Sequence, residues 1–392
     1  MKISTASLVF LRRLLKAALS TAFLFVLACS ESDPEPSVET GNITTIAGIA
    51  GEFDCSGDGG PALSANLGFV TGITVDPSGN IYFVDGAANV VRKIDRTSGI
   101  ISTVAGTFLG FNVIDPTPSK GDGGPAIDAH LRSPYGVAVD AAGNIYVADT
   151  GNNVVRKISA SGIISTIAGS PDSYGYTGDG ALAKDAQLYG PYDVAVDKDN
   201  NIYVVDSQNA VIRKIAAGTG IITTVAGSGP DHTGFAGDHG LAIDAYLDTP
   251  QGVTLDNVGN LYIVDSGNNA IRKVDASTGI ITTIAGTGQW GYDGDGKQAV
   301  HAKLYAPSRV AVDELGDVYI ADQGSHVIRK ITKATGVINT LAGTAGIAGY
   351  SGDGGPAVDA RLSSPQGVAV DSEGNVFMTE SGNSVIRAVK QN

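Results

Sequence analysis

The sequence has little cysteine, little basic charge and no hydrophobic stretch long enough to cross a membrane. Its 392 residues include two cysteines, Cys29 and Cys55, and 26 basic against 40 acidic residues. The most apolar segment, residues 17–28, is about 12 residues long, whereas a membrane-spanning helix needs roughly 20. These shortages argue against a disulfide framework and against a transmembrane anchor.

The charge balance limits the partners. Residues 1–28 hold four basic residues and no acidic one, so the remainder has 22 basic and 40 acidic residues and a net charge of −18. A body this acidic repels phosphate backbones, and we expect no nucleic-acid partner. Glycine reaches 53, and short runs of Val, Ile, Thr and Tyr alternate with Asp, Gly and Asn. This composition predicts an all-β protein of many short strands.

The N-terminal segment has the features of an export signal. Residues 1–28 combine a basic stretch at 12–16 with the apolar stretch 17–28, as signal peptides do. The following Val26-Leu27-Ala28-Cys29 resembles a bacterial lipoprotein cleavage site. Residues 1–28 are therefore predicted to be a lipoprotein signal peptide, and Cys29 the lipidated, palmitate-bearing N-terminus. Ordinary secretion with a chance cysteine is the alternative.

Residues 29–41 are polar and acidic and contain two prolines. Such a segment cannot pack into a core and predicts an extended tether. The folded domain is expected over residues 42–392. The chain is thus predicted to be exported and held by its N-terminal lipid on the bacterial cell envelope, at the outer membrane or the cell surface. Cys55 lies in a glycine-rich segment and is expected to be structurally neutral.

One 19-residue phrase returns six times along the chain. The second copy reads DAAGNIYVADTGNNVVRKI, and successive copies are separated by 64, 57, 59, 57 and 58 residues. Self-similarity at such a period is typical of repeat architectures. The six copies begin at Asp76, Asp140, Asp197, Asp256, Asp313 and Asp371.

Each repeat resolves into four strand-sized segments, which in the second repeat are residues 136–140, 144–149, 154–158 and 162–169. Four short antiparallel strands form one blade of a β-propeller. The fourth-strand phrase follows the first five repeats, but its sixth copy, NITTIAG, stands at residues 42–48. We therefore predict a six-bladed β-propeller whose N-terminal strand completes the last blade and closes the ring.

An acidic residue and an arginine stand seven residues apart in every repeat. Across a tight turn this spacing puts both side chains on one face of adjacent strands, within reach of each other. One structural ion pair per blade is predicted, because the same chemistry repeated around a ring has no obvious catalytic use. The pairs are Asp85–Arg92, Asp149–Arg156, Asp206–Arg213, Asp265–Arg272, Asp322–Arg329 and Glu380–Arg387.

About 25 residues, here called the insert, join each fourth strand to the next first strand. Every insert contains a Gly-Asp-Gly-like motif, and in three of them proline follows as Gly-Gly-Pro-Ala. Proline suits the first position of a helix, so one or two helical turns are predicted, with the aspartate bonding the N–H groups of its own glycine loop. A structural calcium ion at these loops is the alternative, although later carboxylates of a calcium loop are missing. No other cofactor or metal is expected.

The phrase GNIYVADTGNNVVRKI at residues 143–158 resembles the NHL repeat. The likeness extends over residues 42–392, and the GDGGPA inserts are similar to those of bacterial surface NHL lipoproteins and of the teneurin propeller. The resemblance implies a six-bladed propeller that serves as a platform for protein, RNA or ligand binding. A minority of similar propellers are enzymes, so the family alone does not decide the function.

Departures from the repeat are the best place to look for a site, because what every unit shares is scaffold. The inserts and the links from second to third strands are expected on one face, which becomes the candidate binding face. At the start of each first strand a Pro-x-Gly phrase places varied residues near the channel, with Asp193 and Arg309 in place of glycine. The predicted ligand-contact residues are Tyr135, Tyr192, Asp193, Gln251, Arg309, Gln366 and the only tryptophan, Trp290.

Four inserts carry an aromatic residue three positions before the aspartate, which either stacks on a ligand or covers the insert: Tyr176, Phe235, Tyr292 and Tyr350. Together these features favour a monomeric, non-catalytic binding or scaffold protein that engages a protein or glycan. The alternative is a metal-assisted lyase or hydrolase, similar to gluconolactonase or streptogramin lyase, in the channel mouth. The five histidines recur at no equivalent inner-strand position, which weakens that alternative.

Overall fold

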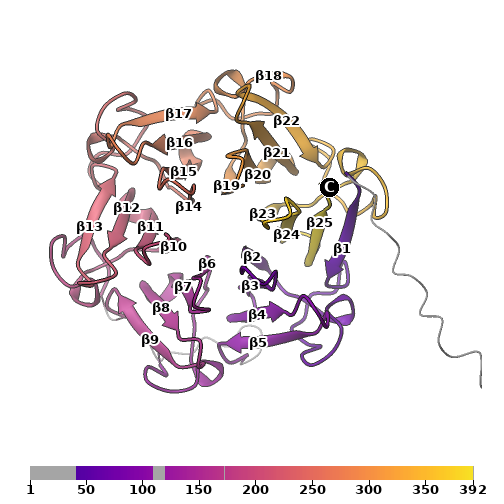
Figure 1. The fold of residues 1–392 in the computed structure, drawn as a ribbon, viewed down its shortest axis with the longest axis horizontal. Helices are drawn as coiled ribbons and strands as arrows, with labels where there is room; N and C mark the ends of the chain where they lie inside the picture. Colours follow the sequence, from indigo (N-terminus) through magenta and orange to yellow (C-terminus); the bar gives the residue numbers. More distant parts are fainter. Residues whose placement is uncertain (1–40, 109–119, 172, 392) are drawn as a thin grey trace, which may run out of the picture. The chain divides into compact units, whose positions relative to one another are not determined.

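The computed structural model describes residues 41–108, 120–171 and 173–391. The compact unit Thr40–Asn392 is a ring of six antiparallel sheets arranged around a central channel (Figure 1). The predicted six-bladed propeller with four-stranded blades is confirmed. Among the described residues, no helix is both long and apolar enough to cross a membrane.

The blades follow one another along the chain, and each is given from the channel outward. Blade 1 contains β2 (Val70–Val75), β3 (Ile81–Asp85), β4 (Val90–Ile94) and β5 (Ile101–Ala105). Blade 2 contains β6 (Val137–Val139), β7 (Ile145–Asp149), β8 (Val154–Ile158) and β9 (Ile164–Ala168). Blade 3 contains β10 (Pro191–Val196), β11 (Ile202–Asp206), β12 (Val211–Ile215) and β13 (Ile222–Ala226).

Blade 4 contains β14 (Gly252–Leu255), β15 (Leu261–Asp265), β16 (Ala270–Val274) and β17 (Ile281–Ala285). Blade 5 contains β19 (Pro307–Val312), β20 (Val318–Asp322), β21 (Val327–Thr332), β22 (Val337–Ala342) and a short outer strand, β18 (Lys297–Gln298). Blade 6 contains β23 (Pro365–Val370), β24 (Val376–Glu380), β25 (Val385–Val389) and β1 (Ile43–Ala47).

The N-terminal strand closes the ring as predicted. β1 pairs antiparallel with β25, with Ile43 opposite Val389. Its outer side is held by the last insert, because Ile43 N–H donates to Gly355 O at 3.0 Å. β1 therefore lies between two partners and presents no free edge.

Local turn chemistry explains the recurrent Asp-x-x-Gly phrase. In blade 2, Asp140 Oδ1 accepts hydrogen bonds from the N–H groups of Ala142 and Asn144, at 3.0 and 2.8 Å. Gly143 has φ +81°, a conformation that favours glycine. This turn joins the first two strands of the blade, and the equivalent turns lie at one end of the ring, here called the turn face.

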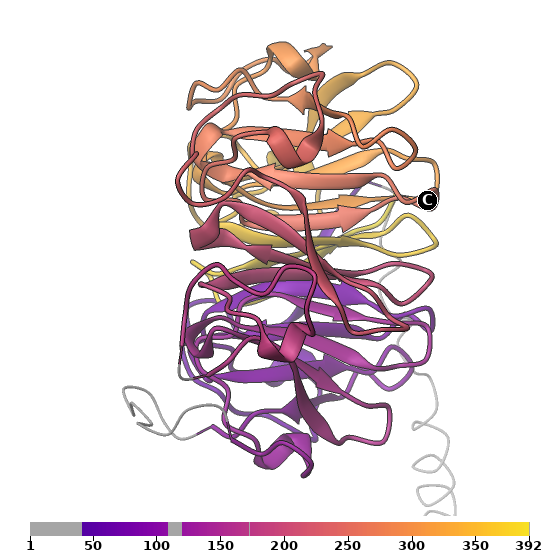
Figure 2. The same cartoon turned by 90° about the vertical axis from the view of Figure 1, so that its left-hand side faces the viewer.

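The opposite end, here called the insert face, is where inserts enter the first strands and where second strands turn into third strands. In side view, the strands of the blades run between the turn face and the insert face (Figure 2). Four of the second-to-third-strand turns contain a 3₁₀ helix: η3 (Thr150–Asn152), η5 (Ser207–Asn209), η7 (Ser266–Asn268) and η9 (Gln323–Ser325).

The hydrophobic core is divided among the blade interfaces. One cluster joins Ala148 and Val155 of blade 2 to Val204 and Ile222 of blade 3, and five similar clusters join the other neighbouring blades. Each blade therefore packs only on its two neighbours, as expected for a repeat protein, and the ring depends on every junction.

The predicted short helical turn is present in the inserts, but the prolines are placed differently from the prediction. In the residues that the structure describes, each insert has one three-residue 3₁₀ helix, and the prolines precede it: Pro61 has ψ 134°, so it is an extended residue before the helix. The cause is pairing, since Pro61 bridges Ile100 at the start of β5. The six helices are η1 (Ala62–Ser64), η2 (Ala126–Asp128), η4 (Ala183–Asp185), η6 (Ala242–Asp244), η8 (Ala299–His301) and η10 (Ala357–Asp359).

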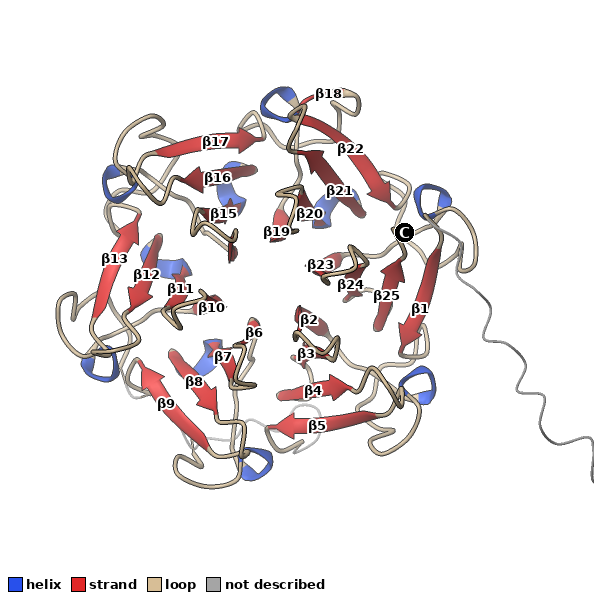
Figure 3. Ribbon diagram, viewed as in Figure 1, coloured by secondary structure: helices blue, strands red, loops and turns tan. Residues whose placement is uncertain are grey.

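The expectation that the inserts crowd one end of the ring is also corrected. The segment around η1 lies along the outer edge of β5, where Ala62 N–H donates to Gly99 O at 2.9 Å. The same segment receives a bond from the preceding blade, because Gly48 N–H donates to Ala62 O at 3.0 Å. The helical turns consequently lie at the rim of the ring (Figure 3), and only the ends of the inserts reach the insert face.

Candidate binding site at one mouth of the central channel

A buried arginine from the third strand of each blade anchors the insert to the ring. In blade 3, Arg213 Nη2 donates to Asp179 Oδ1 at 2.5 Å and to Thr177 O at 2.9 Å, and its Nη1 donates to Gln187 O at 2.9 Å. The aspartates belong to the Gly-Asp-Gly motifs and stand 34 residues before the arginines. The six pairs, all at 2.5–2.7 Å, are Arg92–Asp58, Arg156–Asp122, Arg213–Asp179, Arg272–Asp238, Arg329–Asp295 and Arg387–Asp353.

The insert aspartates therefore do not bond their own glycine loops, as the sequence suggested. Asp58 Oδ2 instead accepts a hydrogen bond from Thr103 N–H of β5 at 2.7 Å. Although burial alone raises it, hydrogen bonds from Thr103 and Arg92 bring the pKa of Asp58 below its ordinary value. An ionised carboxylate at this position joins the insert, the third strand and the fourth strand.

The seven-residue pairs proposed from the sequence are brought together in four blades, at N–O distances of 3.2–3.7 Å: Asp149–Arg156, Asp206–Arg213, Asp265–Arg272 and Glu380–Arg387. In these blades an asparagine three positions after the carboxylate donates to it, as Asn268 does to Asp265 at 2.9 Å. In the described part of blades 1 and 5, no such contact joins Asp85 to Arg92 or Asp322 to Arg329.

Blades 1 and 5 have Ala88 and Ser325 at the asparagine position. The result is one buried carboxylate oxygen without a hydrogen bond in each, on Asp85 and Asp322. Burial raises the pKa of Asp85 to about 6 and that of Asp322 to about 7. The arginine in every blade is thus held mainly by the insert aspartate, and in blades 2, 3, 4 and 6 the seven-residue partner is a weaker second contact.

The aromatic residues three positions before the insert aspartate cover these arginines. The guanidinium carbons lie 4.9–5.5 Å from the ring centroids, within cation–π range. The pairs are Tyr176–Arg213, Phe235–Arg272, Tyr292–Arg329 and Tyr350–Arg387. Cys55 has the equivalent place in blade 1, where burial and Asp85 raise the pKa of its thiol to about 12.

The ring is tightest where the first strands begin. Four blades have glycine two residues after the proline that precedes or begins the first strand, or after its equivalent Val70. A Cβ on Gly72 would lie 2.5 Å from Tyr135 O of the next blade. A Cβ on Gly367 would likewise lie 2.5 Å from Thr71 O. Only blades 3 and 5 place a side chain at this level, Asp193 and Arg309.

Asp193 and Arg309 meet across the channel. Arg309 Nε lies 3.4 Å from Asp193 Oδ2, and both side chains are buried. Asp193 Oδ2 also accepts a hydrogen bond from Val253 N–H of blade 4 at 3.0 Å. Burial raises the pKa of Asp193, and the guanidinium and the Val253 amide oppose that increase.

The remaining donors of Arg309 bind carbonyl groups at the mouth. Its Nη2 donates to Tyr192 O at 3.2 Å, and its Nη1 donates to Gln251 O and to Ser308 O. One side chain therefore connects the first strands of blades 3, 4 and 5. No other blade has an arginine at this position, so Arg309 makes the mouth asymmetric.

Three rings form a continuous row that ends on Arg309, here called the aromatic row. The centroids of Phe69 and Tyr135 are 6.4 Å apart in an edge-to-face arrangement, and those of Tyr135 and Tyr192 are 4.2 Å apart. The Arg309 guanidinium lies 5.4 Å from the Tyr192 centroid. Phe69 is exposed and both tyrosines are partly exposed. Phe69 was not predicted from the sequence. It stands one position before Val70, and Val70 occupies the position that is proline in the other five blades.

The structure brings Tyr135, Tyr192, Asp193, Gln251 and Arg309 together at this mouth. Gln366 is buried, and its carbonyl accepts a hydrogen bond from Ser308 Oγ at 3.0 Å. Trp290 is not part of this group. It is exposed and lies against Tyr305 of the same insert, with centroids 5.6 Å apart.

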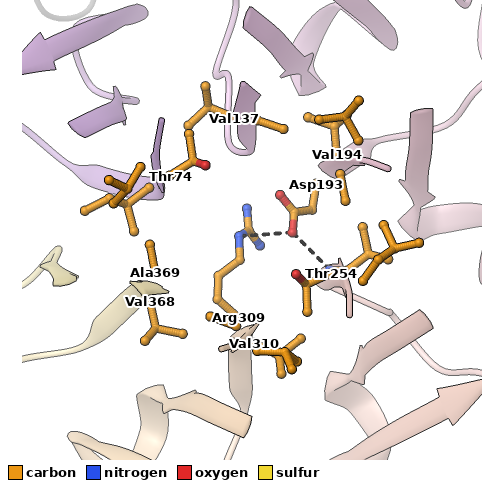
Figure 4. A pocket seen from close by; sticks show the side chains of 18 of the residues that line it. Thr74, Val137, Asp193, Val194, Thr254, Arg309, Val310, Val368 and Ala369 are labelled. Carbon is orange, nitrogen blue, oxygen red and sulfur yellow. Dashed lines mark hydrogen bonds and ion pairs between the residues drawn. The ribbon is translucent and has the colours of Figure 1, made fainter. Parts of the chain in front are cut away.

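Below the mouth lies a cavity of about 200 Å³ along the axis of the ring. Its walls are residues 73–75, 137–139, 194–196, 253–255, 310–312 and 368–370 of the six first strands. The charged side chains of Asp193 and Arg309 project into the channel (Figure 4). Because these two residues precede the wall residues in their strands, they line the cavity at its insert-face end.

Potential metal ligands are dispersed in the described residues, where no three His, Cys, Asp or Glu side chains lie close enough together to hold a metal ion. One histidine has a clear structural role. His326 adopts φ +59° in the blade 5 turn, and its Nδ1 accepts a hydrogen bond from Ser364 N–H of blade 6 at 3.1 Å.

Known proteins share this architecture. Human teneurin-4 is 34% identical over 301 residues, which are 68% of this chain and 10% of teneurin-4. The chloroplast protein Suppressor of quenching 1 of Arabidopsis thaliana is 30% identical over 284 residues, 68% of this chain and 26% of that protein. The chain therefore spans only about a tenth to a quarter of the length of these relatives.

Among solved structures, an auxiliary nutrient binding protein of Bacteroides ovatus superposes with a TM-score of 0.62 at 16% identity, covering 88% of this chain and 75% of that one. This likeness supports the fold alone. The family model of the teneurin NHL domain matches residues 40–120, 114–175, 171–233, 228–292 and 291–351. With five matched repeats and six blades of this construction, the chain belongs to the teneurin-type NHL-repeat propeller family.

Proposed function

We propose that this protein is a non-catalytic binding protein that engages a protein or glycan ligand with its insert face. The aromatic row supports this proposal most directly. Phe69, Tyr135 and Tyr192 come from three successive blades and leave ring surface exposed beside the channel. Aromatic rings supply much of the binding energy of recognition surfaces, because they are large, rigid and amphipathic.

The residues at the mouth have two different roles in this proposal. Tyr135, Tyr192 and Gln251 are partly exposed and are the proposed contact residues. Asp193 and Arg309 are buried, and they act as positioning residues that fix the first strands beneath the row. A preorganised surface binds with a smaller loss of conformational entropy than a mobile one.

The proposed location is the bacterial cell envelope. The export signal at residues 1–28, the lipidation site at Cys29 and the tether at residues 29–41, except its last residue Gly41, lie outside the described residues. Auxiliary nutrient binding proteins of Bacteroides have the same fold, which supports an exported binding role. Lipid labelling of the wild type and of Cys29→Ala tests the anchor: loss of label in the variant is expected, and retained label would contradict it.

A glycan array and a capture experiment with isolated envelope proteins test the binding role. Wild-type protein is expected to bind at least one array glycan or envelope protein, and Tyr135→Ala/Tyr192→Ala to lose that binding. Metal analysis of the purified, untagged protein tests the alternative of a metal-assisted lyase or hydrolase. One tightly held zinc or calcium ion per chain would favour the enzyme and contradict the binding role.

A further inference from the structure

In the part of the chain that the structure describes, the exposed aromatic side chains are confined to the inserts. Among the described residues, every exposed phenylalanine, tyrosine and tryptophan lies between a fourth strand and the next first strand: Phe53, Phe69, Phe108, Tyr174, Tyr189, Phe235, Trp290, Tyr292, Tyr305 and Tyr350. Exposed aliphatic residues, by contrast, also occur on the turn face, as Val258 and Leu315 do. The concentration of exposed rings on the inserts distinguishes the inserts from the turns between first and second strands.

The most exposed rings have equivalent positions in alternate blades. Phe53, Tyr174 and Trp290 each stand five residues before the insert aspartate of blades 1, 3 and 5, and their exposed fractions are 60, 65 and 72%. Blades 4 and 6 have Thr233 and Ala348 at the same position. None of these three rings covers an arginine. In blades 3 and 5 the ring that does so is two positions later, at Tyr176 and Tyr292.

Two of these rings have an aromatic partner, and we call the resulting units the outer aromatic pairs. Tyr174 lies against Tyr189 with centroids 4.7 Å apart and planes tilted by 31°. Trp290 lies against Tyr305 with centroids 5.6 Å apart and planes tilted by 46°. Tyr189 and Tyr305 are themselves exposed, so each pair presents two ring surfaces to solvent. They are separate from the aromatic row at the channel.

The backbone holds both pairs in fixed positions. Gly175 N–H donates to Leu188 O at 3.3 Å, and Gly291 N–H donates to Leu304 O at 3.1 Å, which ties each first ring to the segment of the second. Asn209 Nδ2 additionally donates to Gly175 O at 2.7 Å. Under Tyr305, a Cβ on Gly324 would lie 2.6 Å from Tyr305 Cγ, so glycine leaves the space that the ring fills.

The size of one pair fits a sugar better than a protein. A large aromatic side chain has roughly 150–250 Å² of surface, so one pair with these exposures offers roughly 250 Å². A stable protein interface needs about 800 Å² from each partner. Two compact patches on separate blades do not make one such surface, but each matches the face of one or two pyranose rings.

The chemistry also favours a sugar without charge. The negative face of an aromatic ring attracts the polarised C–H groups of a pyranose. Hydroxyl and amide groups stand beside the first pair, where Thr177 Oγ1 lies 3.3 Å from Gln187 Oε1. The net charge of −18 without residues 1–28 disfavours acidic polymers.

We propose that the outer aromatic pairs Tyr174/Tyr189 and Trp290/Tyr305 are two subsites for a neutral polysaccharide. This inference rests on the proposed binding role of the insert face and names its ligand class. Two subsites on one rigid ring bind a long polymer together, so the second contact occurs at high effective concentration. Each subsite alone is weak.

Affinity electrophoresis of the full chain in gels containing xylan, laminarin, dextran or galactomannan tests the proposal, with polygalacturonate as the acidic comparison. We expect retardation by at least one neutral polymer and none by polygalacturonate. Tyr174→Ala/Tyr189→Ala and Trp290→Ala/Tyr305→Ala should each weaken the apparent affinity at least fivefold, and the combined variant should abolish it. Trp290→Phe should retain most of the affinity, because it keeps a ring.

Val258→Ala/Leu315→Ala is the matched control, because it removes equally exposed apolar surface from the turn face, and it should bind as the wild type does. Melting temperatures within about 2 °C of wild type show that each variant is folded. Unchanged affinity in the combined variant, or no retardation of wild type by any neutral polymer, would overturn the proposal. If Tyr135→Ala/Tyr192→Ala loses binding while the outer pairs are dispensable, the subsites are wrong and the aromatic row remains the contact surface.

Discussion

Arg309 of blade 5 and Asp193 of blade 3 meet across the central channel, with Nε and Oδ2 3.4 Å apart. Both stand where the other four blades have glycine. The pair spans the channel, and Arg309 donates to the carbonyl groups of Gln251 and Tyr192 beneath the aromatic row. The two departures from the repeat are thus one structural feature, and its asymmetry marks the proposed recognition surface.

Breaking this pair is expected to destabilise the ring. Arg309→Ala leaves Asp193 buried without its guanidinium partner and removes the hydrogen bonds from Arg309 to three carbonyl groups, which should cost about 3–5 kcal/mol. The double variant Asp193→Gly/Arg309→Gly restores the residue of the other blades and should be more stable than Arg309→Ala. Thermal unfolding followed by circular dichroism measures both. Equal destabilisation of the single and double variants would mean that the charge pair contributes nothing specific.

A hydrogen-bond donor for the buried Asp322 oxygen that has none is expected to stabilise blade 5. In Ser325→Asn the new amide can donate to the unbonded oxygen of Asp322, as Asn268 donates to Asp265. A gain of about 1.5–3 kcal/mol is expected for one hydrogen bond to a charged group. The reverse change in blade 4, Asn268→Ser, should lose a similar amount. A lower melting temperature for Ser325→Asn would show that the site lacks room for the amide.

The pH dependence of stability should reflect Asp322. Burial raises its pKa to about 7 in the folded protein, against about 3.9 when unfolded. The folded state therefore holds more protons between pH 4 and 7, and this residue's contribution to the free energy of unfolding falls as the pH rises through that window. Asp322→Asn removes the contribution, so its stability relative to wild type should increase from pH 4.5 to pH 8. A constant difference in melting temperature would contradict the assignment.

Ring closure makes the N-terminal strand essential to the fold. Deleting residues 42–48 removes β1, exposes the edge of β25 and empties the positions of the buried residues Ile43 and Ala47. The loss should exceed about 4 kcal/mol and appear as rapid proteolysis. Thr44→Ala alters the same strand at a half-buried position and should have little effect.

The regular part of this architecture follows from the sequence, whereas the site follows only in part. Strand alternation, the six repeated phrases and the displaced NITTIAG copy predict the six blades and the closure of the ring. Blades and closure depend on local sequence patterns. The arginine–aspartate pairs also left a sequence signal, the constant 34-residue spacing of Asp179 and Arg213 and of their equivalents. That signal was missed because the seven-residue spacing is closer and more conspicuous.

The channel contacts could not be obtained in this way. Arg309 and Asp193 are brought together by the diameter of the ring and by the glycines that let the first strands approach, as at Gly72. Neither the ring diameter nor the distance between neighbouring first strands can be read from the spacing of residues in the sequence. The separation of Trp290 from the mouth has the same origin, because the path of each insert along the rim depends on its pairing with the fourth strand.

The most direct test of the account is the affinity of the strongest glycan or envelope ligand for wild type, Tyr135→Ala/Tyr192→Ala and the turn-face control Leu315→Ala, measured by biolayer interferometry. Removing two stacked rings should weaken binding about tenfold or more, while the control stays within about twofold of wild type. Equal affinities for the double variant and wild type, with both proteins folded, would contradict the assignment of the aromatic row as the contact surface.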